Sequence, residues 1–309
     1  MPSLRAVAPS ATVVGDVAET LTRRPAVTNS EQRHKDQVDY WNGPGGAHWV
    51  ARHEHMDRML AQVTDIVLAR AGVAPGMTVL DLGCGCGGTT EVLADLVAPV
   101  GKVVGLDVSA PMLEVASRRL KERRQVKLIC DDAAHHPFAP ATMDVIASRF
   151  GVMFFGDPVS AFTNFGQSLK LGGRLVFACW RKMDENPWMQ VPLAAAAEHV
   201  APFPRHGPDD PGPFAFADPA KVQRIITSAG LKSPRITPRE LVLDLSGGFG
   251  LEQAVTQSAQ LGPISKALEG QPQTVRDAAN RSIRETLRPY ATPTGVLMKA
   301  AIWIVESSR

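Results

Sequence analysis

Short apolar runs and amphipathic stretches alternate along the middle of this chain. The apolar runs predict buried strands at 79–82, 102–106, 126–130, 143–148 and 174–180. The stretches between them have helical spacing and predict helices at 89–97, 112–120 and 158–171, the first with Val92, Leu93 and Leu96 on its apolar stripe. Strands that alternate with helices in this way build a parallel sheet covered by helices on both faces. The pattern therefore predicts an α/β fold.

The pattern changes on either side of this alternation. Residues 1–30 show neither the helical nor the strand period of apolar positions, so we expect a flexible N-terminal arm. We expect this arm to dock on a second copy of the chain in a homodimer. A flexible glycine–proline turn is expected at 43–46, before a helix at 56–71. Beyond residue 181 two segments, here called the excursions, interrupt the alternation at about 183–217 and 246–293. Strands are predicted at 236–245 and 297–305.

Composition and charge narrow the class of protein. The chain has 309 residues, of which 44% are hydrophobic and 21% charged, as in ordinary globular proteins. Its net charge of +2 creates no field that would hold a nucleic acid. The four cysteines, Cys84, Cys86, Cys130 and Cys179, show no metal-ligand spacing, so we expect no metal site. Sparse cysteines and the lack of a signal-like apolar segment predict a cytoplasmic protein that does not enter a membrane.

A glycine-rich turn, Gly83-Cys84-Gly85-Cys86-Gly87-Gly88, joins the strand at 79–82 to the helix at 89–97. Glycines adopt positive φ without strain and let a ligand lie against the backbone N–H groups of the helix start. The next strand ends in Asp107, roughly 20 positions beyond the glycines, where a carboxylate can accept both hydroxyls of a ribose. An adenosine derivative is the predicted ligand.

The glycines alone do not separate two cofactor classes. Gly83-x-Gly85-x-x-Gly88 satisfies the dinucleotide fingerprint of NAD and FAD enzymes. Asp81, two residues before the turn, would repel a pyrophosphate but attract the cationic amino-acid end of S-adenosylmethionine.

In these residues the chain resembles the class I S-adenosylmethionine-dependent methyltransferases that act on small molecules, of the ubiquinone-biosynthesis-like type. The resemblance begins with Asp81–Gly87 and Asp107 and continues through 130–133, 150–155 and 171–175, so that it covers roughly residues 40–182. It implies a Rossmann-like, doubly wound sheet of seven mostly parallel strands whose last strand is antiparallel. The methyltransferase domain would then occupy 31–309, with the excursions forming a lid over the carboxyl edge of the sheet.

The same resemblance implies a set of cofactor contacts. Asp107 would bind the ribose, Asp132 the adenine amino group, and the backbone of Ala133 a ring nitrogen. Arg149, at the end of a strand, is a candidate for the methionine carboxylate or for an anionic acceptor, with an ion pair to Asp157 or another surface acid as the alternative. The full set of expected cofactor residues is Tyr40, Trp49, Asp81, Gly83, Cys84, Gly85, Gly87, Asp107, Val108, Met112, Asp132, Ala133, Arg149 and Phe150.

Acceptor recognition is less visible, because a sulfonium is already a good leaving group and the transfer needs mainly an in-line approach in a dry cavity. A general base, where one is needed, would come from His48, His53 or His55, and Arg149 would orient the acceptor. Aromatic and polar residues expected around the acceptor are Trp41, Phe154, Trp180, Asn186 and Trp188. For each of these residues, packing in the core or capping is the alternative role.

Three functions follow from these observations. A methyltransferase for a small, partly hydrophobic acceptor such as a phenol, quinone precursor, thioether or amine is favoured. An NAD-dependent oxidoreductase is disfavoured by Asp81 and by the lack of a tyrosine–lysine pair, since Tyr40 and Tyr290 are the two tyrosines. A non-catalytic adenosyl-binding module is disfavoured because the whole series of motifs is present.

Overall fold

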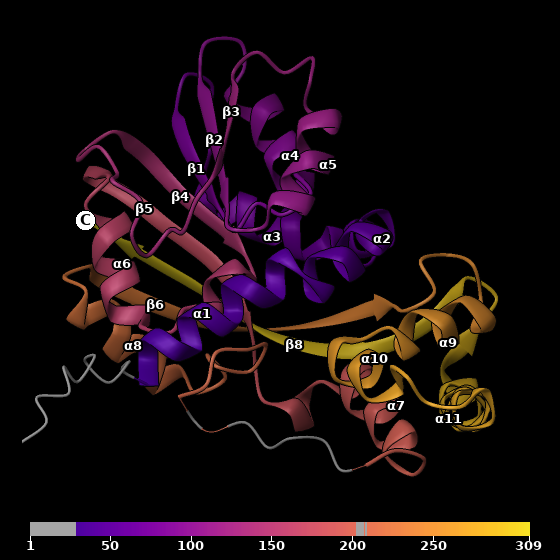
Figure 1. Cartoon of the computed structure of the whole chain (residues 1–309). Helices are drawn as coiled ribbons and strands as arrows, with labels where there is room; N and C mark the ends of the chain where they lie inside the picture. Colours follow the sequence, from indigo (N-terminus) through magenta and orange to yellow (C-terminus); the bar gives the residue numbers. More distant parts are fainter. Residues whose placement is uncertain (1–28, 202–206, 208) are drawn as a thin grey trace, which may run out of the picture.

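The computed structural model describes residues 29–201, 207 and 209–309. The main path of its sheet has seven strands in the order β3-β2-β1-β4-β5-β8-β6 (Figure 1). These are β1 (Thr78–Leu82), β2 (Lys102–Asp107), β3 (Val126–Cys130), β4 (Met143–Arg149), β5 (Leu169–Trp180), β6 (Lys232–Asp244) and β8 (Gly295–Ser308). An additional two-residue strand, β7 (Ala291–Thr292), pairs with β8. The predicted seven-stranded, mostly parallel sheet is confirmed, and its last strand is antiparallel to both β5 and β6.

The strand order reverses at β1, which pairs in parallel with β2 on one side and β4 on the other. The chain builds outward from β1 to β2 and β3 and then returns to β4. Such a reversal leaves a crevice at the carboxyl ends of the central strands, where open α/β sheets bind ligands. Asp81, Asp107 and Arg149 all lie at or next to these ends.

Helices cover both faces of the sheet, as the alternating pattern predicts (Figure 1). One group packs on one face and a second group on the other. The first is α3 (Ala61–Ala71), α4 (Gly88–Val97) and α5 (Ala110–Arg119), and the second is α6 (Pro158–Gly166) and α8 (Pro219–Ser228). No helix in the described part of the chain is long and apolar enough to cross a membrane.

The segment before β1 differs from its prediction. The expected flexible turn is replaced by a close junction in which α1 (Asn29–Asn42) and α2 (Pro44–Met59) are separated by Gly43 alone. A Cβ on Gly45 would lie 2.3 Å from the ring of Tyr40, and one on Gly46 would lie 2.1 Å from the carbonyl oxygen of Trp41. These glycines therefore allow two helices to touch rather than making the chain flexible. The predicted arm, residues 1–30, lies outside the described residues except for its last two, which begin α1.

Two helix predictions were wrong in detail. The helix predicted at 158–171 ends at Gly166, because Leu169 is buried and already pairs with Met143 at the start of β5. On α4, Val92 and Leu96 are exposed, and the buried stripe runs instead through Thr89, Thr90, Leu93, Ala94 and Val97.

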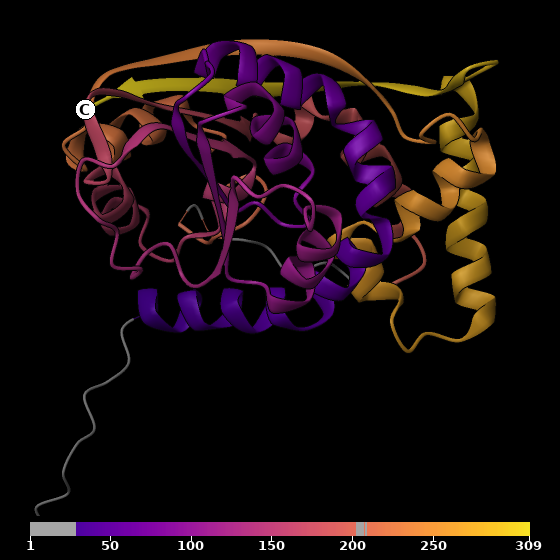
Figure 2. The ribbon, with the colours of Figure 1, turned by 90° about the horizontal axis from the view of Figure 1, so that it is seen from above.

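The two predicted excursions lie together in space. They form α7 (Pro187–Ala197), α9 (Leu251–Ala259), α10 (Gly262–Leu268) and α11 (Gln273–Leu287), with short 3-10 helices η2 (Met183–Glu185) and η3 (Arg288–Tyr290); another, η1 (Gly151–Phe154), follows β4. Figures 1 and 2 show α7, α9, α10 and α11 gathered beyond the end of β6. Ile264, Ala279, Ile283 and Leu287 supply buried apolar side chains for this group. The carboxyl-edge position matches the expectation, while the role as a lid stays a prediction.

A partly buried ion network fixes α2 against the sheet and α5. The Asp57 carboxylate accepts hydrogen bonds from Arg149 at 2.9 Å and from Arg119 at 2.8 Å. A Cβ on Gly88 would lie 2.4 Å from an Asp57 oxygen, so glycine at the first residue of α4 lets the carboxylate approach. Burial works to raise the pKa of Asp57, but the two guanidinium groups hold it below its usual value of 3.8. The ion-pair alternative for Arg149 is thus what the structure shows, and its second contact is the hydroxyl of Thr64.

Replacing Asp57 tests this network. Asp57→Asn should lower the free energy of unfolding at pH 7 by about 2 kcal/mol, because it leaves the partly buried Arg149 without its anion and Arg119 with only the more distant Glu91. A carboxyl with a depressed folded pKa contributes stability above its unfolded pKa and loses it as pH falls through the folded pKa. The difference between wild type and variant in urea unfolding should therefore shrink below about pH 4. Asp65→Asn, at an exposed position of α3, is the matched control, and equal losses in both variants would contradict the assignment.

Candidate functional site

The glycine turn has the backbone geometry that its sequence predicts. Gly83, Gly85 and Gly87 have φ values of 70°, 54° and 81°. A Cβ on Gly83 would lie 2.8 Å from the Cα of Gly151, so this position is closed by a neighbouring backbone. At Gly85 the nearest atoms to such a Cβ are Met112 Sδ and Trp49 Nε1, both at 3.8 Å. The turn is therefore open at Gly85 and can admit a ligand between the backbone and these side chains.

Asp107 lies beside this opening at the end of β2. Its carboxylate is 7% exposed and accepts hydrogen bonds from Gly85 N at 2.8 Å and Ser109 N at 2.9 Å. Burial raises the pKa of Asp107, while these backbone donors oppose the rise. A carboxylate has about four acceptor positions, so roughly two remain for a ligand. This is the capacity that a pair of ribose hydroxyls requires.

Asp81 lies deeper, at 1% exposure, and accepts a 2.6 Å hydrogen bond from the hydroxyl of Thr90. Burial raises the pKa of Asp81 to about 6, against the lowering effects of Thr90 and Arg149. An acid with this pKa is ionised at pH 7 and is responsive to a nearby cation. Thr90 was not found by sequence reasoning; the signal available was a hydroxyl in the first turn of the helix that follows the glycines.

Aromatic side chains from α1 and α2 gather near the turn. Trp41 makes edge-to-face contacts with Phe154, at a ring-centroid distance of 5.0 Å, and with Trp49 at 6.3 Å. The carbonyl of Trp41 accepts a hydrogen bond from Ser109, two residues after Asp107. Trp49 and Trp41 thus lie close to the predicted cofactor residues, and Phe154 joins them. Tyr40 contacts Trp41, but its hydroxyl lies toward Gly262 of the α10 segment.

The predicted residues Cys84, Val108 and Met112 surround the turn mainly as packing. Cys84 is buried against Leu113 and α5, and burial raises its pKa well above the usual value for a thiol. Met112 packs with Cys86, whose pKa burial raises to about 12. The carbonyl of Val108 accepts a hydrogen bond from Asn42, which ties the end of α1 to the end of β2. Neither thiol is ionised near neutral pH, which fits a packing role for both.

Asp132 and Ala133 follow β3, as the adenine prediction requires. The Asp132 carboxylate accepts a hydrogen bond from Ala134 N at 3.0 Å, so it also caps its own turn. It further contacts His135 Nδ1 and His34 Nε2. The carbonyl of Ala133 accepts a hydrogen bond from Asn164. The position of these residues at the sheet edge fits the prediction, and α1 reaches the same edge through His34.

Three predicted acceptor residues are enclosed in the core. Trp180 is 5% and Trp188 2% exposed, and Trp180 stacks on Phe150 with centroids 4.1 Å apart. Asn186 is fully buried: its amide donates to the carbonyls of Arg181, Lys182 and Ala301, and its oxygen accepts from Ala301 N and the Trp188 indole. These bonds use the whole side-chain amide, so Asn186 has a structural role here and no group left for an acceptor.

The three candidate histidines do not converge on the turn. His48 is exposed and approaches the hydroxyl of Ser265 at 3.3 Å, and His53 contacts the carbonyl of Val50 at 2.7 Å. His55 is 4% exposed, and its ring nitrogens have no partner among the described residues. Burial, followed by the charges of Arg52 and Arg58, lowers the pKa of His55 to about 4, so it is a neutral and weak base.

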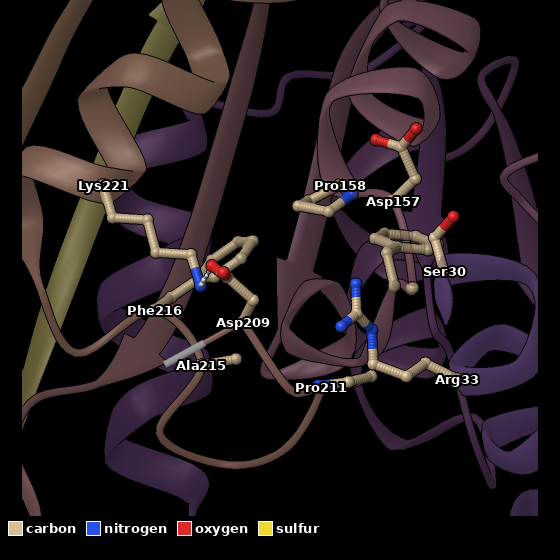
Figure 3. A pocket seen from close by; sticks show the side chains of 11 residues that line it. Ser30, Arg33, Asp157, Pro158, Asp209, Pro211, Ala215, Phe216 and Lys221 are labelled. Atoms are coloured by element: carbon tan, nitrogen blue, oxygen red, sulfur yellow. Dashed lines mark ion pairs between the residues drawn. The ribbon is translucent and has the colours of Figure 1, made fainter. Parts of the chain in front are cut away.

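Two surface cavities lie away from the glycine turn. One of about 220 Å³ lies between α1, the start of α6 and α8, and Figure 3 shows Arg33, Asp157 and Phe216 around it, with an ion pair between Asp209 and Lys221. Another of about 350 Å³ lies between His48 and the α10–α11 segment. Both have mixed polar and apolar linings, unlike the aromatic acceptor cavity expected from the sequence.

Residues 80–177 match the sequence model of the methyltransferase domain family. A demethylmenaquinone methyltransferase from Lactococcus lactis is 36% identical over 111 residues, which are 35% of this chain and 44% of that protein. Another, from a Geobacillus species, is 33% identical over 134 residues, which are 40% of this chain and 57% of that protein. The chain spans about half the length of the curated relatives it matches.

Solved structures share the fold. The YcgJ protein of Bacillus subtilis superimposes with a TM-score of 0.53 at 16% identity, over 81% of this chain and 98% of that chain. A phosphoethanolamine N-methyltransferase from Haemonchus contortus, solved with S-adenosylhomocysteine, superimposes with a TM-score of 0.53 at 15% identity, over 89% of this chain and 60% of that chain. At such identities the likeness concerns the fold alone. The sequence match assigns residues 80–177 to the methyltransferase domain family, and Asp81, Gly85 and Asp107 all lie within this segment.

Proposed function

We propose that this protein transfers a methyl group from S-adenosylmethionine to a small, partly hydrophobic acceptor. The observation that carries the proposal is the pairing of an open glycine turn at Gly85 with two buried carboxylates, Asp81 and Asp107, in a methyltransferase domain. Two carboxylates attract the sulfonium and ammonium groups of S-adenosylmethionine, whereas they would repel the negatively charged pyrophosphate of a dinucleotide. The same observation argues against the dinucleotide alternative.

The residues around the turn fit the parts of this cofactor. Asp107 has acceptor positions for the ribose hydroxyls, and Asp81 supplies a negative charge for the ammonium side. Asp132 and Ala133 would meet the adenine. Arg149 is held by Asp57 and Thr64, so we assign it the positioning of α2 and a long-range effect on Asp81, rather than a direct bond to acceptor or cofactor.

When bound, the cofactor supplies an activated methyl group, and the protein must orient the acceptor and exclude water. Trp41, Trp49 and Phe154 form an aromatic cover near the turn that can do both. Of the candidate histidines, His48 and His53 contact other groups and His55 is buried as a weak base. We therefore propose that the chain provides positioning rather than a strong general base, which suits an acceptor that ionises readily or reacts through carbon or sulfur.

The acceptor is proposed to be apolar and aromatic in character. The relatives matched over part of their length are named for demethylmenaquinone, so a quinone precursor or phenol is the first class to test. The helices α7, α9, α10 and α11 at the carboxyl edge are proposed as the lid that selects it. We further propose that residues 31–309 act as one cytoplasmic methyltransferase domain, and that residues 1–30 support a homodimer.

Removing the Asp107 carboxylate tests the cofactor assignment. Asp107→Ala should weaken S-adenosylmethionine binding by about 1.5–3 kcal/mol, the range for hydrogen bonds to a charged group. Calorimetry with the cofactor measures this loss. Asp131→Ala, an exposed acid beside the predicted adenine residues, should bind within about a factor of two of wild type. Wild-type affinity in a folded Asp107→Ala variant would remove the assignment.

The pKa of Asp81 predicts a pH dependence of cofactor affinity. Because burial raises this pKa to about 6 in the free protein, the carboxyl takes up a proton as pH falls through that value. A cationic ligand prefers the ionised form, so affinity should be constant above about pH 7 and fall by up to about tenfold per pH unit below about pH 6. Titrations across this range should show the fall in wild type and a weaker, flatter profile in Asp81→Asn. A wild-type profile that is as flat as that of the variant would refute the role of Asp81.

The acceptor can be found directly with methyl-labelled cofactor and metabolite extracts. We expect label in small, organic-extractable phenols or quinone precursors, because the residues near the turn are aromatic and the chain has a net charge of only +2. Label found only in tRNA, rRNA or protein would contradict the proposal of a small-molecule acceptor. Label in no product, despite tight cofactor binding, would instead support a non-catalytic adenosyl-binding module.

A further inference from the structure

Two histidines and a carboxylate meet where α1 crosses the loop after β3. His34 comes from α1, and Asp132 and His135 come from the loop. One ligand atom from each residue lies within 4.8 Å of the other two. His34 Nε2 is 3.2 Å from Asp132 Oδ2, and His135 Nδ1 contacts the same oxygen. Two rings therefore point nitrogen atoms at one carboxylate oxygen.

We propose that His34, Asp132 and His135 form a binding site for a divalent transition-metal ion of the zinc type. Imidazole nitrogens with one carboxylate are the ligands such ions prefer, whereas Mg²⁺ and Ca²⁺ require sites built mainly from oxygen. Two ligand atoms at about 2.1 Å from a tetrahedral zinc are about 3.4 Å apart. The 3.2 Å separation of His34 Nε2 and Asp132 Oδ2 is close to this value. His135 Nδ1 lies closer to the same oxygen, so the exposed His135 ring would turn away from Asp132 to bind the ion.

The local structure supports ligand roles for these side chains. The second oxygen of Asp132 is held by Ala134 N, which fixes the carboxylate and leaves Oδ2 directed at the two rings. The His34 and His135 rings meet nearly edge-on, with centroids 5.3 Å apart, so both nitrogens can face a common point. His135 is 75% exposed and Asp132 19% exposed, which leaves an open path and room for a water molecule as the fourth ligand.

The proposed zinc site shares Asp132 with the predicted adenine contacts of the methyl-transfer site. His34 and His135 have no role in the proposed transfer, and zinc would add a link between α1 and the sheet edge. Binding that favours the folded state raises the midpoint of thermal unfolding. The expectation of no metal, drawn from cysteine spacing, could not include this cluster because His34 is remote from Asp132 in the sequence.

Titration of the full-length, chelator-treated protein with ZnCl₂ tests the site by calorimetry. We expect saturable binding of one zinc ion per chain and a higher thermal midpoint with zinc, and no competition from MgCl₂. His34→Ala, His135→Ala and Asp132→Asn should each weaken zinc binding by at least about tenfold and abolish the thermal shift, because each removes a direct ligand.

His136→Ala is the matched control, since this neighbouring histidine contacts Asp131 instead. It should bind zinc like wild type. If His34→Ala in α1 disturbs folding, His135→Ala still tests the site, because the His135 side chain is mostly exposed and its removal should not affect folding. Absence of saturable binding to wild type, or unchanged binding in a His34→Ala, His135→Ala double variant, would overturn the proposal.

Discussion

The carboxylate of Asp57 is the constraint on which the rest of the site depends. It joins three elements that are separate in the chain: α2, the end of β4 through Arg149, and α5 through Arg119. Its approach to the start of α4 requires a glycine at position 88. With α2 fixed in this way, Trp49 lies beside the opening at Gly85. One partly buried ion network therefore determines where the N-terminal helices cover the glycine turn.

The two acids of the turn have different environments and hence different properties. Asp107 has backbone donors on both oxygens and keeps acceptor positions free, which suits hydroxyl groups. Asp81 has one hydroxyl partner, Thr90, and a pKa raised by burial to about 6, which suits a cation. The same residue type at the ends of adjacent strands thus has two different environments, which fit the two parts of the cofactor that we propose it binds.

Helices that are distant in sequence gather beyond the carboxyl end of β6. α7 and the group α9 to α11 pack together beyond β6, and Asn186 ties the start of α7 to β8 through Ala301 (Figure 1). Arg52 of α2 reaches this group through hydrogen bonds to Gln257 and to the carbonyl of Gln260. The N-terminal helices and the excursions are therefore in direct contact, so a displacement of one should shift the other.

The sequence by itself determined the sheet and the geometry of its glycine-rich turn, because strand periodicity, glycines with positive φ and an acid at the end of β2 act over short distances along the chain. Asp81, Gly85 and Asp107 could be found for that reason. Only the tertiary structure decided the partner of Arg149, the structural role of Asn186 and the burial of Trp180 and Trp188. Each of these depends on contacts between remote segments, such as Asp57 with Arg149, Asn186 with Ala301, and Trp180 with Phe150. The type of a side chain limits the roles that the residue can have. Its burial and its hydrogen-bond partners, which depend on the fold, decide which of these roles it takes.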